Sequence, residues 1–125
     1  MNLQKQKRIK EILSKKTIGI AGAGGLGSNA AVSLARSGIG KLIIVDFDSV
    51  EKSNLNRQYY FLDQIGMRKV DALKETIFRI NPQVIIETIH LKLIPGKMYT
   101  PFTKANIIIE ALDDAKTKKL FIEEI

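Results

Sequence analysis

The chain has 125 residues, of which 45% are hydrophobic and 26% charged, and its formal net charge at pH 7 is +7. This length accommodates one domain with a sizeable core. The absence of cysteine excludes thiolate metal sites and cysteine nucleophiles within these residues. No apolar run approaches the roughly 20 residues of a membrane span. The first residues lack the apolar core of a secretion signal, so we expect a cytoplasmic protein.

Apolar periodicity predicts alternating strands and helices along the chain. Residues 1–16 have apolar positions at helical spacing among lysines, which predicts an amphipathic N-terminal helix. The run Lys41–Asp46 has four consecutive apolar residues, which is typical of a strand buried on both faces of a parallel sheet. The expected elements, in chain order, are a helix at Leu3–Lys15, a strand at Thr17–Ala21, a helix at Gly25–Ser37, a strand at Lys41–Asp46, a helix at Gly66–Ile80, a strand at Val84–Ile89, a strand at Ile107–Ile109 and a helix from Asp114 onward.

This order predicts an α/β fold of the Rossmann-like, doubly wound type with a mainly parallel sheet. A single domain would occupy residues 1–125. No closing strands follow the last predicted helix, so we expect the domain to be truncated. His90 is expected to be a surface residue at a strand end. A polar stretch from Phe47 to Gln64 shows little apolar periodicity, and a loop of this length is uncommon unless it works at a site.

The stretch Gly22–Gly27 reads Gly-Ala-Gly-Gly-Leu-Gly and joins a predicted strand directly to a predicted helix. Backbone N–H groups and the helix dipole converge at such a turn, so it is a ready phosphate site. Gly22, Gly24 and Gly27 match the G-x-G-x-x-G pattern, and Gly25 leaves further room for a bulky triphosphate. Asp46 follows 24 positions after Gly22, near the distance at which an acidic residue meets a ribose in dinucleotide folds.

Three functions compete for this turn: a nicotinamide or flavin dinucleotide enzyme, an ATP-using enzyme that adenylates a carboxylate, and a non-catalytic nucleotide-sensing module. A dehydrogenase would explain the glycines and Asp46 but leaves no role for a second polar cluster. That cluster comprises Asp48, Asn54, Arg57, Gln58 and Lys69.

If the ligand is a nucleoside triphosphate, the residues of this polar cluster can bind its phosphates. Arg57 and Lys69 could hold the β- and γ-phosphates through charge-assisted hydrogen bonds. Asp113, at the carboxyl end of the last predicted strand, suits a magnesium ion that bridges phosphate oxygens. Read singly, Arg57 and Lys69 could be solvated charges and Asn54 could make an Asx-turn. Asp114 is the better candidate for the helix N-cap.

Four sequence blocks, in order and at sensible spacing, resemble the adenylation domain of the ThiF/MoeB/HesA family, which includes the ubiquitin-activating enzymes. The resemblance covers about residues 17–115. The segment Asn54–Tyr60 looks most like the compact ThiF type, which activates the sulfur carrier ThiS for thiamine synthesis. The four blocks are Gly22–Gly27, Val45–Val50, Ser53–Gln58 and Gly66–Lys69.

The resemblance implies ATP-dependent adenylation of the C-terminal carboxylate of a small ubiquitin-like carrier, with Mg²⁺ held at Asp113. It implies that the glycine turn holds the ATP phosphates and that Asp46 binds the ribose. Asn54, Arg57 and Lys69 would contact phosphates, with Asp48 and Gln58 in supporting roles. It also suggests a homodimer. Nucleic acid is not the expected partner. Alternatives are adenylation of a molybdopterin carrier, a tRNA-modifying dehydratase, or an NAD-binding oxidoreductase.

Overall fold

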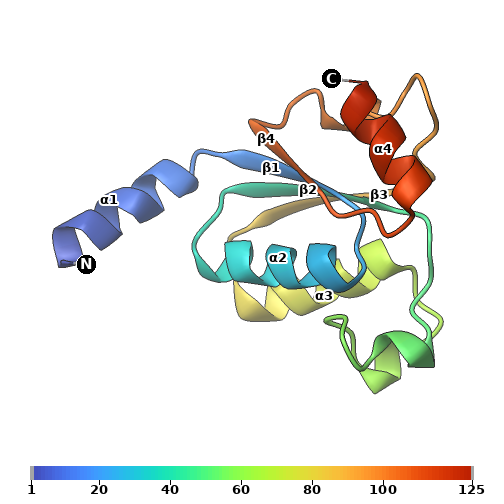
Figure 1. Ribbon diagram of the computed structural model, residues 1–125. Helices are drawn as coiled ribbons and strands as arrows, with labels where there is room; N and C mark the ends of the chain where they lie inside the picture. The colour runs from blue at the N-terminus through green and yellow to red at the C-terminus, as the bar shows by residue number, and fades with distance from the viewer. Residues whose placement is uncertain (1, 125) are drawn as a thin grey trace.

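The computed structural model describes residues 2–124 and shows one parallel sheet with helices on both faces (Figure 1). The strands lie in the order β3-β2-β1-β4, and each neighbouring pair is parallel. This architecture confirms the predicted α/β, Rossmann-like fold. The elements, in chain order, are α1 Leu3–Leu13, β1 Thr17–Ala21, α2 Gly25–Arg36, β2 Lys41–Asp46, the 3-10 helices η1 Lys52–Asn54 and η2 Leu62–Gln64, α3 Lys69–Ile80, β3 Ile85–His90, the 3-10 helix η3 Thr100–Phe102, β4 Ile107–Glu110 and α4 Ala115–Glu123.

Strand β2 is buried on both faces, as its apolar run predicts. Leu42 and Ile44 belong to the core between the sheet and helices α2 and α3. Ile43 and Val45 point to the opposite core, which α4 and the segment 91–105 complete. Because successive side chains of a strand alternate between its faces, four consecutive apolar residues supply both cores. The two layers hold the sheet rigidly enough to place loops at its carboxyl edge.

Helix α1 projects away from the sheet and buries none of its residues (Figure 1). Its first turn is capped by the Asn2 side chain, which accepts a hydrogen bond from the Lys5 N–H at 2.8 Å. The helix ends at Leu13, two residues earlier than predicted, and Leu13 alone packs against the main core. Its apolar side chains Leu3 and Ile12 are 82% and 50% exposed. The amphipathic N-terminal helix is therefore confirmed, and none of its residues is buried by the described part of the chain.

None of the helices formed by residues 2–124 is both long enough and apolar enough to cross a membrane.

Helix α3 begins at Lys69 rather than at the predicted Gly66. Gly66 has φ of +92°, a left-handed conformation that cannot open a helix. The two residues after it pair with the segment that follows β2: the Val50 N–H donates to the Met67 carbonyl, and Ser49 bridges Arg68. This pairing keeps residues 66–68 out of the helix and brings the start of α3 next to the segment that follows β2. His90 is the last residue of β3 and is exposed, as predicted.

Candidate nucleotide site

The glycine turn is the tightest backbone crossing at the carboxyl edge of the sheet. A Cβ atom at Gly27 would lie 1.8 Å from the Gly22 carbonyl oxygen, and one at Gly22 would lie 2.6 Å from the Ala111 carbonyl oxygen. Gly22 also has φ of +104°. Only glycine allows α2 to start this close to β1 and β4. Helix α2 therefore begins only a few residues after the end of β1, and its N-terminus lies at the carboxyl edge of the sheet.

Asp46, the last residue of β2, binds the glycine turn from the side. One carboxylate oxygen accepts the Ala23 N–H at 2.7 Å, and the other accepts the Asp48 N–H at 2.7 Å. The side chain thus fixes the turn and the start of the next loop relative to each other. Each oxygen retains a further lone pair, so a ribose hydroxyl can still donate to it. This placement is compatible with the ribose role that the sequence predicts for Asp46.

A cavity of about 270 Å³ lies between the glycine turn, the end of β2, the segment after β3 and the start of α4. Its walls bring together five of the predicted site residues: Gly22, Gly24, Asp46, Asp48 and Asp113. The register explains the convergence, because Ala21 of β1 lies opposite both Val45 of β2 and Glu110 of β4. The carboxyl ends of these three strands therefore meet at one edge, as expected for an open α/β sheet.

The cavity also has an apolar wall that the sequence patterns did not predict. Leu91, Lys92 and Leu93, from the irregular segment after β3, line the cavity together with Phe47. The Lys92 ammonium lies 5.4 Å from the centroid of the Phe47 ring, a cation–π distance. An apolar wall opposite carboxylates and backbone N–H groups is the usual composition of a small-molecule site. The only sequence signal for it was the position of these residues just after a strand.

Asp113 and Asp114 have different roles. A Cβ atom on Gly24 would lie 3.1 Å from a carboxylate oxygen of Asp113, so this carboxylate stands directly over the turn. Asp114 is the N-cap of α4 and accepts the Thr117 N–H at 3.0 Å, as predicted. Within residues 2–124, no three His, Cys, Asp or Glu side chains form a group that could hold a metal ion by themselves. A cation at Asp113 would thus need oxygens from the ligand.

The capping role gives a pH-dependent prediction. The hydrogen bonds from the Thr117 side chain and N–H hold the pKa of Asp114 below its ordinary value of 3.8. A carboxyl group with a depressed folded-state pKa stabilises the fold above its unfolded pKa, and this stability is lost as the pH falls through the folded value. We expect Asp114→Ala to lower the melting temperature at pH 7 and to lower it less as the pH falls below 3.8. Asp113→Ala is the matched control and should leave the melting temperature unchanged; an equal loss in both variants would contradict the distinction.

The remaining predicted residues do not line this cavity. Asn54 is buried, and its side-chain oxygen accepts the Glu51 N–H at 2.8 Å, so it caps the short helix η1. Arg57 is exposed, and its guanidinium donates to the Ser53 carbonyl at 3.2 Å. The Asn54–Glu51 bond runs back to the residue three positions earlier, so Asn54 belongs to a capping box and does not form the Asx-turn considered from the sequence. The charge of Arg57 has no carboxylate partner among residues 2–124.

Lys69 is a buried cation with one distant counter-ion. Its side chain is 5% exposed, and its ammonium lies 4.0 Å from a carboxylate oxygen of Asp48. Burial, and then repulsion by Asp46, raise the pKa of Asp48 above its ordinary value, while Lys69 opposes them. A buried ammonium normally requires close charge compensation. Asp48 compensates the positive charge of Lys69 only in part, and an anionic ligand in the neighbouring cavity would supply the remaining negative charge.

Gln58 contains an unpaired buried atom. Its side-chain oxygen is buried and has no hydrogen-bond partner among residues 2–124, a rare situation in a folded protein. The oxygen and nitrogen of a glutamine amide are assigned from their hydrogen-bond partners, so this atom can act as an acceptor or, after a flip, as a donor. Either way Gln58 has spare capacity for a bond to a ligand.

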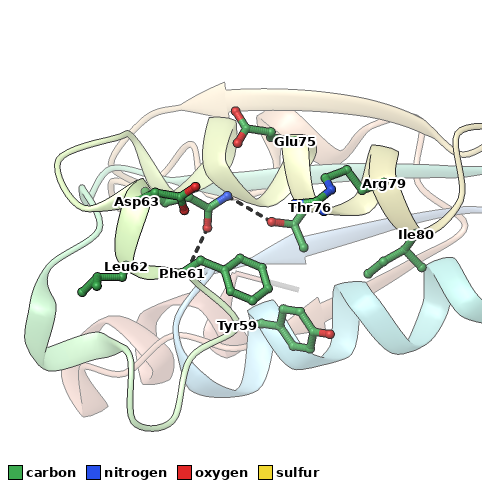
Figure 2. Close-up of a pocket in the computed structure, with 9 residues that line it drawn as sticks. Tyr59, Phe61, Leu62, Asp63, Glu75, Thr76, Arg79 and Ile80 are labelled. Atoms are coloured by element: carbon green, nitrogen blue, oxygen red, sulfur yellow. Dashed lines mark hydrogen bonds between the residues drawn. The ribbon is translucent and has the colours of Figure 1, made fainter.

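A larger groove of about 780 Å³ lies against α3 and contains none of the predicted site residues (Figure 2). The Gln64 side chain lies at its wall, donates to the Thr76 hydroxyl at 3.1 Å and accepts the Phe61 N–H at 3.0 Å. Because the groove contains none of the predicted site residues, we place the candidate site in the smaller cavity. The residues that line the groove are Tyr59, Phe61, Leu62, Asp63, Gln64, Glu75, Thr76, Arg79 and Ile80.

The chain is similar in sequence to known proteins and similar in fold to solved structures. The chain is 39% identical to ubiquitin-like modifier-activating enzyme 5 of Arabidopsis thaliana over 95 residues, which cover 76% of this chain and 22% of that protein. It is 47% identical to the enzyme of the same name from Drosophila mojavensis over 90 residues, which cover 70% of this chain and 23% of that protein. The chain thus spans less than a quarter of the length of these two relatives.

Among solved structures, the fold is similar to that of the E. coli tRNA N6-threonylcarbamoyladenosine dehydratase TcdA in complex with ATP, with a TM-score of 0.89 and 29% identity. That match covers 94% of this chain and 49% of TcdA. E. coli MccB gives a TM-score of 0.85 and 28% identity over 91% of this chain and 34% of MccB. Residues 2–124 match the ThiF family. The resemblance inferred from the four sequence blocks is therefore confirmed at the level of the family, and the chain belongs to the ThiF family.

Proposed function

We propose that this chain is the ATP-binding part of an adenylyltransferase that activates the C-terminal carboxylate of a small ubiquitin-like carrier protein. The observation that carries the proposal is the convergence of the glycine turn, Asp46 and Asp113 on one cavity. The buried, incompletely paired ammonium of Lys69 beside this cavity supports an anionic ligand there. The similarity to ubiquitin-like modifier-activating enzymes and to an ATP complex of TcdA supports the ligand and the class of reaction.

In the proposed reaction, a carboxylate oxygen of the carrier attacks the α-phosphorus of ATP. A new oxygen–phosphorus bond forms, the bond to the β-phosphate oxygen breaks, and pyrophosphate leaves with that electron pair. A carboxylate needs no general base, so the protein has to position the groups and offset charge. Arg57 and Lys69 would stabilise the negative charge of the transferring and leaving phosphates, and the N–H groups of the glycine turn would bind phosphate oxygens.

Mg²⁺ fits the residues near the glycine turn. Asp113 offers a hard carboxylate ligand next to Gly24, and Mg²⁺ commonly binds one or two carboxylates together with substrate phosphates. When bound, the ion would neutralise charge on the phosphate oxygens. Asp113 would hold it, and Asp46 would hold the ribose at the other side of the turn.

For the finer assignment, we propose a carrier of the ThiS type, which would place the protein in thiamine biosynthesis. The segment Asn54–Tyr60 supports this choice through its resemblance to the ThiF type.

A second candidate substrate is a carboxyl group on tRNA, which the similarity to the tRNA dehydratase TcdA and the net charge of +7 favour. We also propose that the protein forms a homodimer, because Leu3, Ile9 and Ile12 of α1 are exposed among residues 2–124. A monomeric mass in sedimentation equilibrium would exclude the dimer.

The test is ATP–pyrophosphate exchange with the whole protein that contains this chain. Purified ThiS-type and molybdopterin-type carriers, each with a free Gly-Gly C-terminus, and tRNA are compared as substrates. We expect exchange with the ThiS-type carrier and none when its terminal carboxylate is blocked. Exchange with tRNA alone would favour the second candidate. Absence of exchange with every substrate, together with tight NAD binding, would refute adenylation.

A further inference from the structure

The loop that carries Arg57 is tied to the glycine turn and to α2 by side-chain hydrogen bonds. The Tyr60 hydroxyl donates to the Ala23 carbonyl at 2.6 Å. The Tyr59 N–H donates to the Ser28 hydroxyl at 2.9 Å. Tyr60 and Ser28 are 5% and 0% exposed, so both bonds form away from solvent. Two consecutive loop residues are thereby held against the turn and the first residues of α2.

A third connection involves Arg57 itself. The Asn29 side-chain amide donates to the Gly25 carbonyl at 2.7 Å and to the Arg57 carbonyl at 3.1 Å. Gly25 is the first residue of α2, so one planar amide spans the glycine turn and the backbone of the arginine. The two bonds of Asn29 therefore set the separation between the first residue of α2 and the backbone of Arg57.

We propose that Ser28, Asn29 and Tyr60 are positioning residues that hold Arg57 in register with the glycine turn before ATP binds. The inference rests on the proposed function, in which Arg57 acts on the triphosphate. None of the three side chains lines the cavity, so they act through the turn and the loop and not by touching the nucleotide.

The physical reason for such ties is preorganisation. Arg57 is exposed and belongs to a long polar loop, so without attachment it would sample many positions relative to the turn. A displacement of about 1 Å can cost on the order of a hundredfold in rate when a charged group must meet a transition state. The Tyr60–Ala23 hydrogen bond does not depend on pH in the neutral range. Burial, with a further contribution from Asp46, raises the pKa of the Tyr60 phenol, so the phenol keeps its donor proton.

The experiment uses the whole protein with two variants and two matched controls. Tyr60→Phe removes only a hydroxyl, and Asn29→Leu removes the amide donor at similar volume on an exposed helix position. Tyr59→Phe removes the hydroxyl of the neighbouring tyrosine, and Ser33→Ala removes a hydroxyl from the exposed side of α2. In the described part of the chain, neither control side chain makes a hydrogen bond. Asn29→Leu keeps the test available if Tyr60→Phe does not fold.

Three quantities are measured: kcat and KM for ATP in the exchange assay, the Kd for AMP, and the rate of tryptic cleavage after Arg57. We expect Tyr60→Phe and Asn29→Leu to lower kcat by roughly tenfold to a hundredfold and to speed cleavage after Arg57. The affinity for AMP and the melting temperature should stay close to those of the wild type, as should every quantity in the two controls. A purely structural role would change the melting temperature and leave no separation between kcat and AMP affinity.

Cleavage reports the attachment of the loop independently of the reaction. If the wild-type protein shows no exchange with any substrate, the proposed function fails, while faster cleavage in the two variants still supports the attachment. If both variants fold and are cleaved at the wild-type rate, the positioning role is overturned. It is also overturned if cleavage accelerates but kcat in an active enzyme does not change.

Discussion

Arg57→Ala should lower kcat for carrier-dependent ATP–pyrophosphate exchange by roughly a hundredfold to a thousandfold, the cost of removing one donor that stabilises a developing charge. The fold should be almost unaffected. The guanidinium is exposed, and within residues 2–124 it bonds only to the Ser53 carbonyl and the neighbouring Asn56 side chain. Changes at such surface positions usually fall within about 0.5 kcal/mol of the wild-type free energy of unfolding. Exchange kinetics and urea unfolding of the same preparations measure the two effects.

The matched control is Arg36→Ala, which removes the same charge from the last turn of α2. This end of the helix is opposite to the glycine turn, so exchange should not change. A comparable loss of exchange in Arg36→Ala would mean that the net positive charge, and not the position of Arg57, attracts the substrates. If Arg57→Ala does not fold, Arg57 is structural and its proposed role fails.

Gly27→Ala should have the largest effect on stability. The added Cβ would lie 1.8 Å from the Gly22 carbonyl oxygen, which is backbone and cannot rotate away. Either α2 or the turn has to shift, and overpacking of this kind costs on the order of 3 kcal/mol. We expect a matching fall in the free energy of unfolding and loss of ATP binding. Urea denaturation and calorimetric titration with ATP measure these two quantities.

Gly25→Ala is the corresponding control, two residues away in the same turn. A Cβ at Gly25 would meet no atom within 4 Å, so the free energy of unfolding should not change. Because this open space faces away from the protein's own atoms, we expect the methyl group to disturb the triphosphate and to weaken ATP more than AMP. Equal stability of Gly27→Ala and Gly25→Ala would show that the turn is not as closely packed as described.

The fold could be predicted because its signals are local and strong. The continuous apolar run in β2, the small residues of α2 and the glycine turn each specify an element within a few residues of sequence. The start of α3 could not be predicted, because Gly66 and the residues after it pair with Val50 and its neighbours. That pairing depends on a tertiary contact with no periodicity in the sequence.

The site was predictable in part for the same reason. Gly22, Asp46 and Asp113 end or follow strands, and parallel strands bring their carboxyl ends to one edge. Leu91 and Leu93 belong to an irregular segment whose path depends on packing against α4, so no pattern marked them. The burial of Lys69 was not predicted either, because a lysine at a helix start is usually solvated. The sequence allowed a phosphate contact or an Asx-turn for Asn54, and only the structure shows that its oxygen caps η1.

The walls of the nucleotide cavity come from segments far apart in the chain, with Gly22 on one side and Asp113 on the other. The cavity is complete only after β4 has joined β1, which is the last pairing that the sheet can make along the chain. A nucleotide would therefore bind the folded domain more tightly than a chain in which β4 has not yet paired with β1. At a hundred times its Kd, a ligand specific for the native state adds about 2.7 kcal/mol to the free energy of unfolding. In the proposed function ATP is the substrate, and by binding the native state it would also stabilise the folded domain.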